Sequence, residues 1–333
     1  MLAAYYKNLK ISTKHLFYSI SNLLYTEEYN STSMTKTAWV IPGQGSQVVG
    51  MGVDLQNIPA AKARFEAAEK VLGWSVLDIC QGDEITLART LYTQPSLYVI
   101  ESILVDLLRE RTDLPELVAG HSLGEYVALY AAGVFDFESG LRLVKKRAEL
   151  MDSAAGGKMA ALMKFDREEL DAVLAKTPDV VLANDNSKGQ VVISGTPKAV
   201  EEVVRQVKVK RVMMLNVGGA FHSPLMETAS SQFMTVLDKI NFNDAQVAVL
   251  SNVEPTPTVD QQELKRRLAA QMTGSVCWRE IMLQFSALNI TNITEVGPGK
   301  ALCGLIKRTC KEISLENIGT LEQLDAKTLV LTP

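Results

Sequence analysis

One serine of this chain stands in a pattern that is typical of enzyme nucleophiles. The stretch GHSLG, residues 120–124, matches G-x-S-x-G, in which a tight turn from strand to helix presents a strained serine between small residues. A short apolar run precedes it, and an apolar helical pattern follows. A structural role is the alternative, because Ser122 and Glu125 have the spacing of a capping box at a helix start. We predict that Ser122 is a catalytic nucleophile.

A serine hydroxyl needs a neighbouring base to take its proton, and histidine is the usual choice near neutral pH. The chain holds three histidines. His15 lies in an atypical leader, and His121 follows the strand next to the serine, where it would point to the opposite face. His222, in GGAFHSPLM, is therefore the predicted general base. No Asp or Glu stands out between Ser122 and His222, so either an acid or a backbone carbonyl orients the imidazole.

One charged residue falls on the apolar face of a predicted helix at residues 138–153. At about 100° per residue, Arg147 lies in the middle of the apolar half, and the other charges lie on the opposite half. A buried guanidinium needs a partner, and an internal salt bridge or a side chain that reaches water would supply one. Alternatively, Arg147 binds a carboxylate of the substrate through two parallel hydrogen bonds. Beside a nucleophilic serine, it would then select the thioesters of dicarboxylic acids.

Composition excludes several classes of function. The chain has 333 residues, of which 47% are hydrophobic and 22% charged, which is an ordinary globular balance with enough length for a sizeable core. The net charge of −4 gives no general basic face for nucleic acid, and no apolar run reaches transmembrane length. Four cysteines lack metal-ligand spacing and favour free thiols in a reducing compartment. They are Cys80, Cys277, Cys303 and Cys310.

The first 33 residues differ from the rest of the chain. They hold several tyrosines, three lysines and no acid before Glu27. A transit-like segment that directs the protein to an organelle is one interpretation, but arginine and the features of a signal peptide are missing. We favour a disordered or non-native leader, with the true start at Met34. The protein is then expected in the cytoplasm.

The elements around these residues predict an α/β fold. Helical patterns span residues 60–73, 95–111, 125–132, 138–153, 224–240 and 260–272, and a last strand and helix fall within 293–308. Strands alternating with such helices indicate a mainly parallel sheet that is covered on both faces.

Between the two halves of this pattern, the order of elements changes. Residues 158–217 follow the order β-α-β-β-α-β of the ferredoxin-like split unit. We therefore predict a large α/β-hydrolase-like domain at residues 34–157 and 218–320, a small inserted ferredoxin-like subdomain at 158–217, a cleft between them and a C-terminal tail at 321–333.

Several motifs together make the chain similar to malonyl-CoA:acyl carrier protein transacylases and to the related acyltransferase domains of polyketide synthases. The motifs are PGQGSQ at 42–47, GHSLGEY at 120–126, an arginine 25 residues after the serine, NSKGQVVISG at 186–195, AFHSPLM at 220–226 and EVGPGKALCGLIKR at 295–308. The resemblance runs from about Thr35 to about Gly319 and gives the leader no counterpart.

The resemblance implies transfer of a malonyl group from malonyl-CoA to the phosphopantetheine thiol of acyl carrier protein, through a malonyl-serine, for fatty acid biosynthesis. Ser122 would be the acylated nucleophile, His222 the base and later the acid, and Arg147 the ligand of the malonyl carboxylate. Gln44 and the backbone N–H of Leu123 would form the oxyanion hole.

Further positions carry over from the same resemblance. The main-chain carbonyl of Gln271 would orient the histidine, and the bulk of Phe221 would disfavour a branched methylmalonyl group. Glu125 matches the family motif, although a capping role suffices for it. Three residues fall where coenzyme A contacts are expected, or else are solvated surface: Asn186, Lys210 and Arg211.

The implied partners are malonyl-CoA and acyl carrier protein, with no cofactor or metal, no nucleic acid, no membrane and a monomeric state. Acyl carrier proteins are generally acidic, so basic residues near the cleft are candidate docking contacts: Lys307, Arg308 and Lys311. Two rival functions stay open at this point. One is a serine esterase or thioesterase, in which water takes the acyl group, and the other is a non-catalytic module that binds carrier protein.

Overall fold

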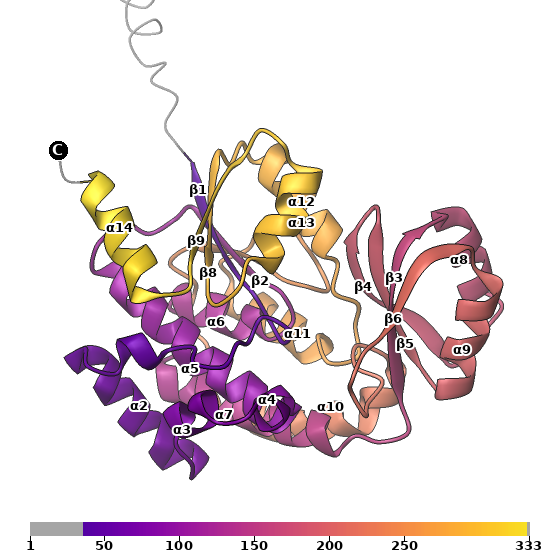
Figure 1. The fold of residues 1–333 in the computed structure, drawn as a ribbon, viewed down its shortest axis with the longest axis horizontal. Coiled ribbons are helices and arrows are strands. Elements are labelled where there is room, and N and C mark those ends of the chain that lie inside the picture. Colours follow the sequence, from indigo (N-terminus) through magenta and orange to yellow (C-terminus); the bar gives the residue numbers. More distant parts are fainter. Residues whose placement is uncertain (1–35, 332–333) are drawn as a thin grey trace, which may run out of the picture. The chain divides into compact units, whose positions relative to one another are not determined.

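The structure is a computed structural model that describes residues 36–331 (Figure 1). A central sheet of five parallel strands has the order β7-β2-β1-β8-β9. Its strands are β1 (Thr37–Ile41), β2 (Leu117–Gly120), β7 (Ala248–Leu250), β8 (Asn292–Val296) and β9 (Ser314–Ile318). The predicted α/β fold with a parallel sheet is therefore present, and the predicted leader lies outside the described residues.

Both faces of this sheet are buried. Successive side chains of a strand alternate between the two faces, and those on each face pack in an apolar cluster. Trp39 and Ile41 pack in one cluster, and Ala38 and Val40 pack in another. The first cluster includes residues of α2 (Pro59–Leu72), α5 (Thr90–Arg109), α6 (Gly124–Ala131) and α7 (Phe137–Ser153). The second includes residues of α12 (Trp278–Ala287) and α13 (Ala301–Thr309).

Further helices accompany the parallel sheet, and the sequence analysis predicted only some of them. They are α3 (Val76–Gln81), α4 (Glu84–Ala88), α10 (Glu227–Leu237), α11 (Gln261–Ala270) and α14 (Leu321–Leu331), with short 3-10 helices η3 (Val53–Leu55) and η4 (Pro224–Met226). Helices α3, α4 and α12 and strand β9 were not predicted, and the predicted tail contains α14. Helix α5 starts at Thr90, five residues before the expected start at Pro95.

A second sheet is antiparallel, with the order β4-β5-β3-β6. Its elements follow the chain as β3 (Lys158–Phe165), α8 (Arg167–Leu174), β4 (Val180–Ser187), β5 (Gln190–Gly195), α9 (Pro197–Gln206) and β6 (Val209–Met214). Figure 1 shows α8 and α9 on the face of this sheet that lies away from the parallel sheet. These helices and strands share a separate apolar core. The predicted domain boundaries stay predictions.

The antiparallel sheet joins the rest of the chain at two places. The chain leaves and returns at neighbouring points, since the Gly157 N–H donates to the Gly218 carbonyl over 3.1 Å. At the second place, the backbone of β4 pairs with residue 276: Asp185 N–H donates to Val276 O (2.9 Å), and Val276 N–H donates to Ala183 O (2.8 Å). The second connection ties the antiparallel sheet to a segment of the large domain that reaches the candidate site.

Two observations bear on the excluded classes of function. Within residues 36–331, no helix has the length and apolar character to cross a membrane, and no cluster of three metal-ligating side chains occurs. All four cysteines are free thiols.

Candidate active site

Ser122 lies on a strained turn between β2 and α6. Its φ of +53° is in the left-handed region, which residues other than glycine seldom adopt. A Cβ at Gly120 would overlap the backbone of Gly124, and a Cβ at Gly124 would overlap the carbonyl of Ile41. Because only glycine fits at both positions, α6 packs directly against the ends of β1 and β2. This turn is the one that the G-x-S-x-G pattern predicts.

The capping-box interpretation is wrong. Helix α6 has Leu123 at its N-cap, and no side chain caps it. The Ser122 N–H instead donates to Asn252 Oδ1 over 2.7 Å. Glu125 is 1% exposed, and its Oε2 accepts from the Asn252 N–H (3.2 Å) and from Gln271 Nε2 (2.7 Å). Glu125 is therefore a buried acceptor rather than a helix cap.

His222 contacts the serine directly. Its Nε2 lies 2.8 Å from Ser122 Oγ. Its Nδ1 lies 2.9 Å from the main-chain carbonyl of Gln271 and 3.2 Å from that of Gly274. Because carbonyls only accept, they hold the proton on Nδ1 and leave the lone pair of Nε2 for the serine hydroxyl. Backbone carbonyls thus orient the imidazole, and no acid of the described chain bonds to it.

The environment of His222 keeps it neutral. Burial lowers its pKa from the ordinary value near 6.5 to about 3, with a further contribution from the positive charge of Arg147. The imidazole is 4% exposed. At neutral pH it is therefore unprotonated, which is the form that a general base requires.

The neighbouring histidine faces elsewhere. His121 Nε2 lies 2.8 Å from Asn186 Oδ1, and its ring packs edge-on against Trp278 at a centroid distance of 5.5 Å. Asn186 is 6% exposed, so its alternative as solvated surface is wrong. Lys210 and Arg211 lie exposed on β6.

Arg147 is fully buried and points at the same oxygen as His222. Its Nη2 donates to Ser122 Oγ (3.0 Å) and to Gln271 Oε1 (3.1 Å), and its Nη1 donates to Gln94 Oε1 (2.7 Å). The guanidinium also lies over the ring of Tyr126, at 5.4 Å.

This guanidinium has no ion pair with any described residue. Arg147 is 0% exposed, and no described carboxylate lies within 4.0 Å of its nitrogens. The readings of Arg147 as a salt-bridge partner or as a side chain that reaches water are therefore wrong. Its Nε also has no hydrogen-bond partner among the described residues. Burial lowers the pKa of Arg147, which reflects the cost of a buried charge without a direct carboxylate partner.

The loop after β1 reaches the turn that carries the serine. A Cβ at Gly43 would overlap the carbonyl of His121 and lie 3.6 Å from Leu123 N, so glycine is needed for this approach. The next residue, Gln44, donates from Nε2 to Thr90 Oγ1 (3.0 Å) and accepts at Oε1 from Gln94 (3.3 Å). The loop therefore brings Gln44 beside the turn, although its amide is held by α5.

A cavity of about 400 Å³ lies next to residues that contact the site, although Ser122, Arg147 and His222 are not part of its lining. Its lining includes Thr90, which holds Gln44, and Phe221, which precedes the base. Met151 and the Arg89–Asp152 ion pair line another part of it. The cavity gives the site a space on the side of Phe221, the residue expected to discriminate acyl groups.

Three polar residues of the site were missed by sequence reasoning. Asn252 and Gln94 carried no motif, and Glu125 was interpreted as a cap. Gln94 was missed because the helix was predicted to start at Pro95, which left this residue outside it. In the structure α5 starts at Thr90, and the Gln94 side chain is buried against α7. For Asn252 and Glu125 the deciding contacts come from distant parts of the chain.

Taken together, the site holds a strained hydroxyl, a neutral base on one side of its oxygen and a buried guanidinium on the other. Such an arrangement suits nucleophilic attack on an acyl group that carries its own carboxylate.

Comparisons with known proteins give three findings of the same kind. The model of the acyl transferase domain family matches residues 38–330. The malonyl CoA-acyl carrier protein transacylase of Synechocystis sp. is 58% identical over 291 residues, which are 87% of this chain and 99% of that protein. The crystal structure of a Synechocystis malonyl-CoA:ACP transacylase has a TM-score of 0.86 and 57% identity, covering 88% of this chain and 100% of its own.

A further solved structure contains a partner. It is a malonyl-transacylase in complex with its type II polyketide synthase acyl carrier protein, with a TM-score of 0.84 and 33% identity, and it covers 89% of this chain and 100% of that one.

Proposed function

This chain belongs to the acyl transferase domain family, and we propose that it is the enzyme that moves a malonyl group from malonyl-CoA to an acyl carrier protein. The observation that carries the assignment is Arg147, a buried guanidinium that pairs with no carboxylate of residues 36–331 and donates to Ser122 Oγ. A carboxylate on the acyl group is the partner that this charge lacks.

We propose a ping-pong mechanism. The Ser122 oxygen attacks the thioester carbonyl while His222 Nε2 takes the hydroxyl proton over the observed 2.8 Å contact. The tetrahedral intermediate then collapses, the C–S bond breaks, and the imidazolium returns the proton to the coenzyme A sulfur. The thiol of the phosphopantetheine arm takes the malonyl group from Ser122 by the same steps in reverse.

The oxyanion of each tetrahedral intermediate needs preorganised donors. We assign this role to the N–H of Leu123 and to Gln44, as the family resemblance implies. The close approach of the Gly43 loop to Leu123 supports the assignment. A donor of this kind contributes about 3–4 kcal/mol to transition-state stabilisation in other enzymes.

Malonyl recognition follows from the position of Arg147. The malonyl carboxylate would accept two of its N–H groups and would take over the hydrogen bond that Nη2 now gives to Ser122 Oγ. Phe221, 6% exposed beside the base, would leave no room for a methyl branch. Asn186, Lys210 and Arg211 are the proposed contacts of coenzyme A.

The carrier protein is the second proposed partner. Lys307, Arg308 and Lys311 are exposed at the end of α13 and suit an acidic protein. The complex of a related transacylase with its carrier protein supports such a pairing. We assign the step to fatty acid biosynthesis, with a polyketide pathway as the alternative. A monomeric state, a cytoplasmic location and the absence of a cofactor stay predictions.

Intact-mass spectrometry tests this function. Wild-type protein mixed with malonyl-CoA should gain one malonyl group, and Ser122→Ala should gain none. Addition of a holo acyl carrier protein should discharge the adduct and acylate the carrier. Fatty acid and polyketide carrier proteins, offered in parallel, distinguish the two pathways. Rapid hydrolysis without transfer would identify an esterase, and no reaction would identify a binding module.

A further inference from the structure

Glu125 occupies a position that the reaction described above does not use. It belongs to the first turn of α6, three residues after the nucleophile, and is 1% exposed. Two groups donate to its Oε2, the Asn252 N–H and Gln271 Nε2. Both belong to the part of the sequence that follows the antiparallel sheet. The other oxygen of Glu125, Oε1, has no hydrogen-bond partner among residues 36–331, so these two donors are the contacts that hold the buried carboxyl group in place, and losing either one would leave Oε2 poorly satisfied in the interior.

The first donor leads to the backbone of the nucleophile. Asn252 accepts the N–H of Ser122 at Oδ1 (2.7 Å), and its Nδ2 donates to the Gly120 carbonyl (2.6 Å). A single amide thus bridges the turn on both sides of His121. Since Glu125 fixes the main chain of Asn252, it fixes this bridge.

The second donor leads to the other catalytic groups. Gln271 Nε2 donates to the Ser122 carbonyl (2.8 Å), and its Oε1 accepts from Arg147 Nη2 (3.1 Å). The Gln271 main-chain carbonyl is the one that faces His222 Nδ1. The N–H and the carbonyl of Ser122, whose φ is strained, are therefore both held by amides that Glu125 anchors.

The same arrangement places Glu125 close to Arg147 without a direct contact between the two side chains. The carboxylate of Glu125 lies one amide away from the guanidinium, since Gln271 bonds to both. A direct ion pair would compete with a substrate carboxylate for the same N–H groups. The contact through Gln271 holds Glu125 next to the guanidinium and leaves the face toward Ser122 available.

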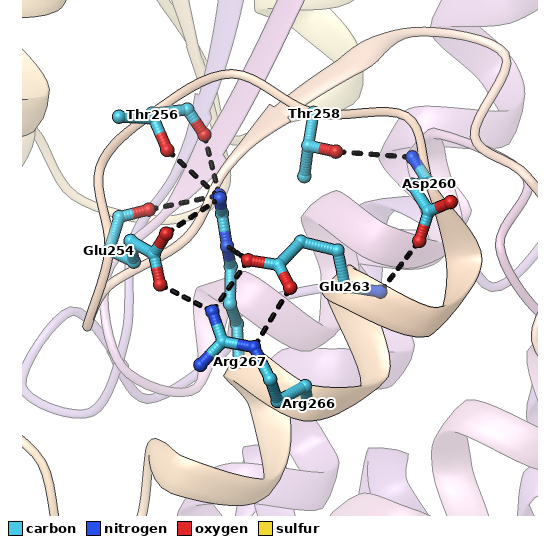
Figure 2. Close-up of polar contacts among 7 residues, drawn as sticks. All are labelled: Glu254, Thr256, Thr258, Asp260, Glu263, Arg266 and Arg267. Atoms are coloured by element: carbon cyan, nitrogen blue, oxygen red, sulfur yellow. Dashed lines mark hydrogen bonds and ion pairs between the residues drawn. The ribbon is translucent and has the colours of Figure 1, made fainter.

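The two amides are themselves fixed relative to each other. Arg267 of α11 has a buried side chain, 4% exposed. Figure 2 shows it bonded to the loop that follows Asn252. Its Nη1 donates to the carbonyls of Glu254 (3.1 Å) and Thr256 (2.6 Å), and its Nε donates to Glu263 (2.8 Å). Gln271 caps the C-terminal end of the same helix. These contacts of Arg267 therefore fix the positions of both amides relative to Glu125.

We propose that Glu125 is a positioning residue of the transfer reaction. Acting through Asn252 and Gln271, it holds the strained backbone of Ser122 and the guanidinium of Arg147 in the geometry that acylation requires. This inference rests on the proposed malonyl transfer.

The test compares Glu125→Ala, Glu125→Gln and a matched control, Glu101→Gln. Glu101 is another fully buried glutamate, and its oxygens bond to none of the site residues. Three quantities are measured: kcat and KM for malonyl transfer, the rate at which a fluorophosphonate probe labels Ser122, and the midpoint of urea unfolding.

Glu125→Ala should lower kcat about 100-fold with a smaller change in KM, because displacements of about 1 Å have this effect on positioned groups. Probe labelling should slow in parallel. Glu125→Gln retains an oxygen acceptor and should stay within about tenfold of wild type. Glu101→Gln should keep wild-type kcat and labelling whatever its unfolding midpoint.

Wild-type kcat and labelling in folded Glu125→Ala would overturn the proposal, as would an equal loss in the Glu101 control. If Glu125→Ala does not fold, Glu125→Gln and Gln271→Met decide. Their effects on kcat should be less than multiplicative in the double variant, because both act along one path, and fully multiplicative effects would refute it. The probe reaction needs no malonyl-CoA, so it reports on positioning even if malonyl transfer itself is not found.

Discussion

At the scale of single residues, the proposed selectivity for malonyl rests on a guanidinium that has no ion pair within residues 36–331. Arg147 is completely buried, and its hydrogen bonds go only to neutral oxygens, of Ser122, Gln94 and Gln271. A neutral acyl group would leave that charge as it is, whereas a malonyl group would neutralise it. The recognition energy therefore depends on the carboxylate rather than on the fit of the acyl chain.

Arg147→Ala should separate malonyl from acetyl transfer. We expect kcat/KM for malonyl-CoA to fall at least about 100-fold, or about 3 kcal/mol, because charge-assisted hydrogen bonds are lost. The ratio of acetyl to malonyl transfer should rise. Arg142→Ala is the control, since Arg142 lies exposed on the same helix and pairs with Glu138. An unchanged ratio would contradict the assignment of Arg147 as the carboxylate ligand.

His222 should make stability depend on pH. Its folded pKa of about 3 is below the unfolded value near 6.5, so the unfolded chain binds more protons between these limits. The contribution is complete above pH 6.5 and is lost as the pH falls toward 3. From pH 7.5 to pH 5 the loss should be about 2 kcal/mol. Urea unfolding of His222→Asn, compared with wild type at both pH values, measures it, and identical pH slopes would contradict it.

The sequence was sufficient for some site residues and insufficient for others. Ser122 and Arg147 stand out locally, one in a short motif and the other on the wrong face of a helix. Glu125 did not, because its spacing from Ser122 is the same in a capping box and in this site. What distinguishes the two is a contact with Gln271, which is 146 positions away. No local pattern carries such information.

At the scale of elements, helix α11 supports the site through residues that do not contact Ser122 themselves, apart from Gln271 at its end. Its residue Arg267 bonds to two backbone carbonyls and the Glu254 carboxylate of the loop after β7, and to the Glu263 carboxylate of α11 itself. The end of the helix then places Gln271, and the start of the loop places Asn252. Small shifts of α11 would therefore reach the serine through both amides.

Arg267→Ala should weaken both stability and catalysis. Removal of a buried, multiply bonded guanidinium should lower the free energy of unfolding by about 3 kcal/mol. The rate of malonyl transfer should fall in the folded fraction, because Gln271 loses its support. Arg266→Ala is the control: this side chain is exposed and should have little effect. Equal effects of the two substitutions would show that the buried contacts of Arg267 contribute neither to stability nor to catalysis.

Most of the helices that the sequence predicted show a repeated apolar pattern, although α12, with ten residues, was missed. Helices α2 and α7 were located within about a turn, because each shows several repeats of an apolar face. Helices α3 and α4 have six and five residues, too few for the pattern to repeat. Strand β9 is a partly buried edge strand whose alternation is weak. The early start of α5 was missed because Pro95 favours a first turn, yet here it lies inside the helix.

At the scale of the whole molecule, the antiparallel sheet is coupled to the base. Strand β4 pairs with residue 276, close after the carbonyls of Gln271 and Gly274 that orient His222. The buried carboxylate of Asp185 strengthens this junction, because its Oδ2 accepts both from Arg167 of α8 (2.9 Å) and from Arg279 of α12 (3.1 Å). Movement of one sheet against the other would thus be felt at the imidazole.

Asp185→Ala should loosen this junction. We expect the free energy of unfolding to fall by about 1–2 kcal/mol, since two partly exposed arginines lose a shared partner. Malonyl transfer should slow several-fold, and the backbone amides of residues 271–277 should exchange hydrogen faster. Asp171→Ala removes only an exposed partner of Arg167 and serves as the control. Unchanged exchange in residues 271–277 would contradict the coupling.

The distribution of the site along the chain has a consequence for biosynthesis. Ser122, Arg147 and His222 leave the ribosome well before the carbonyls at 271 and 274 that orient the imidazole. Until then, the carbonyl of Ser122 lacks its contact with Gln271, and the His222 ring lacks its two carbonyl partners. Chain elongation must therefore pass residue 274 before Ser122 and His222 can adopt the geometry that we propose for acyl transfer.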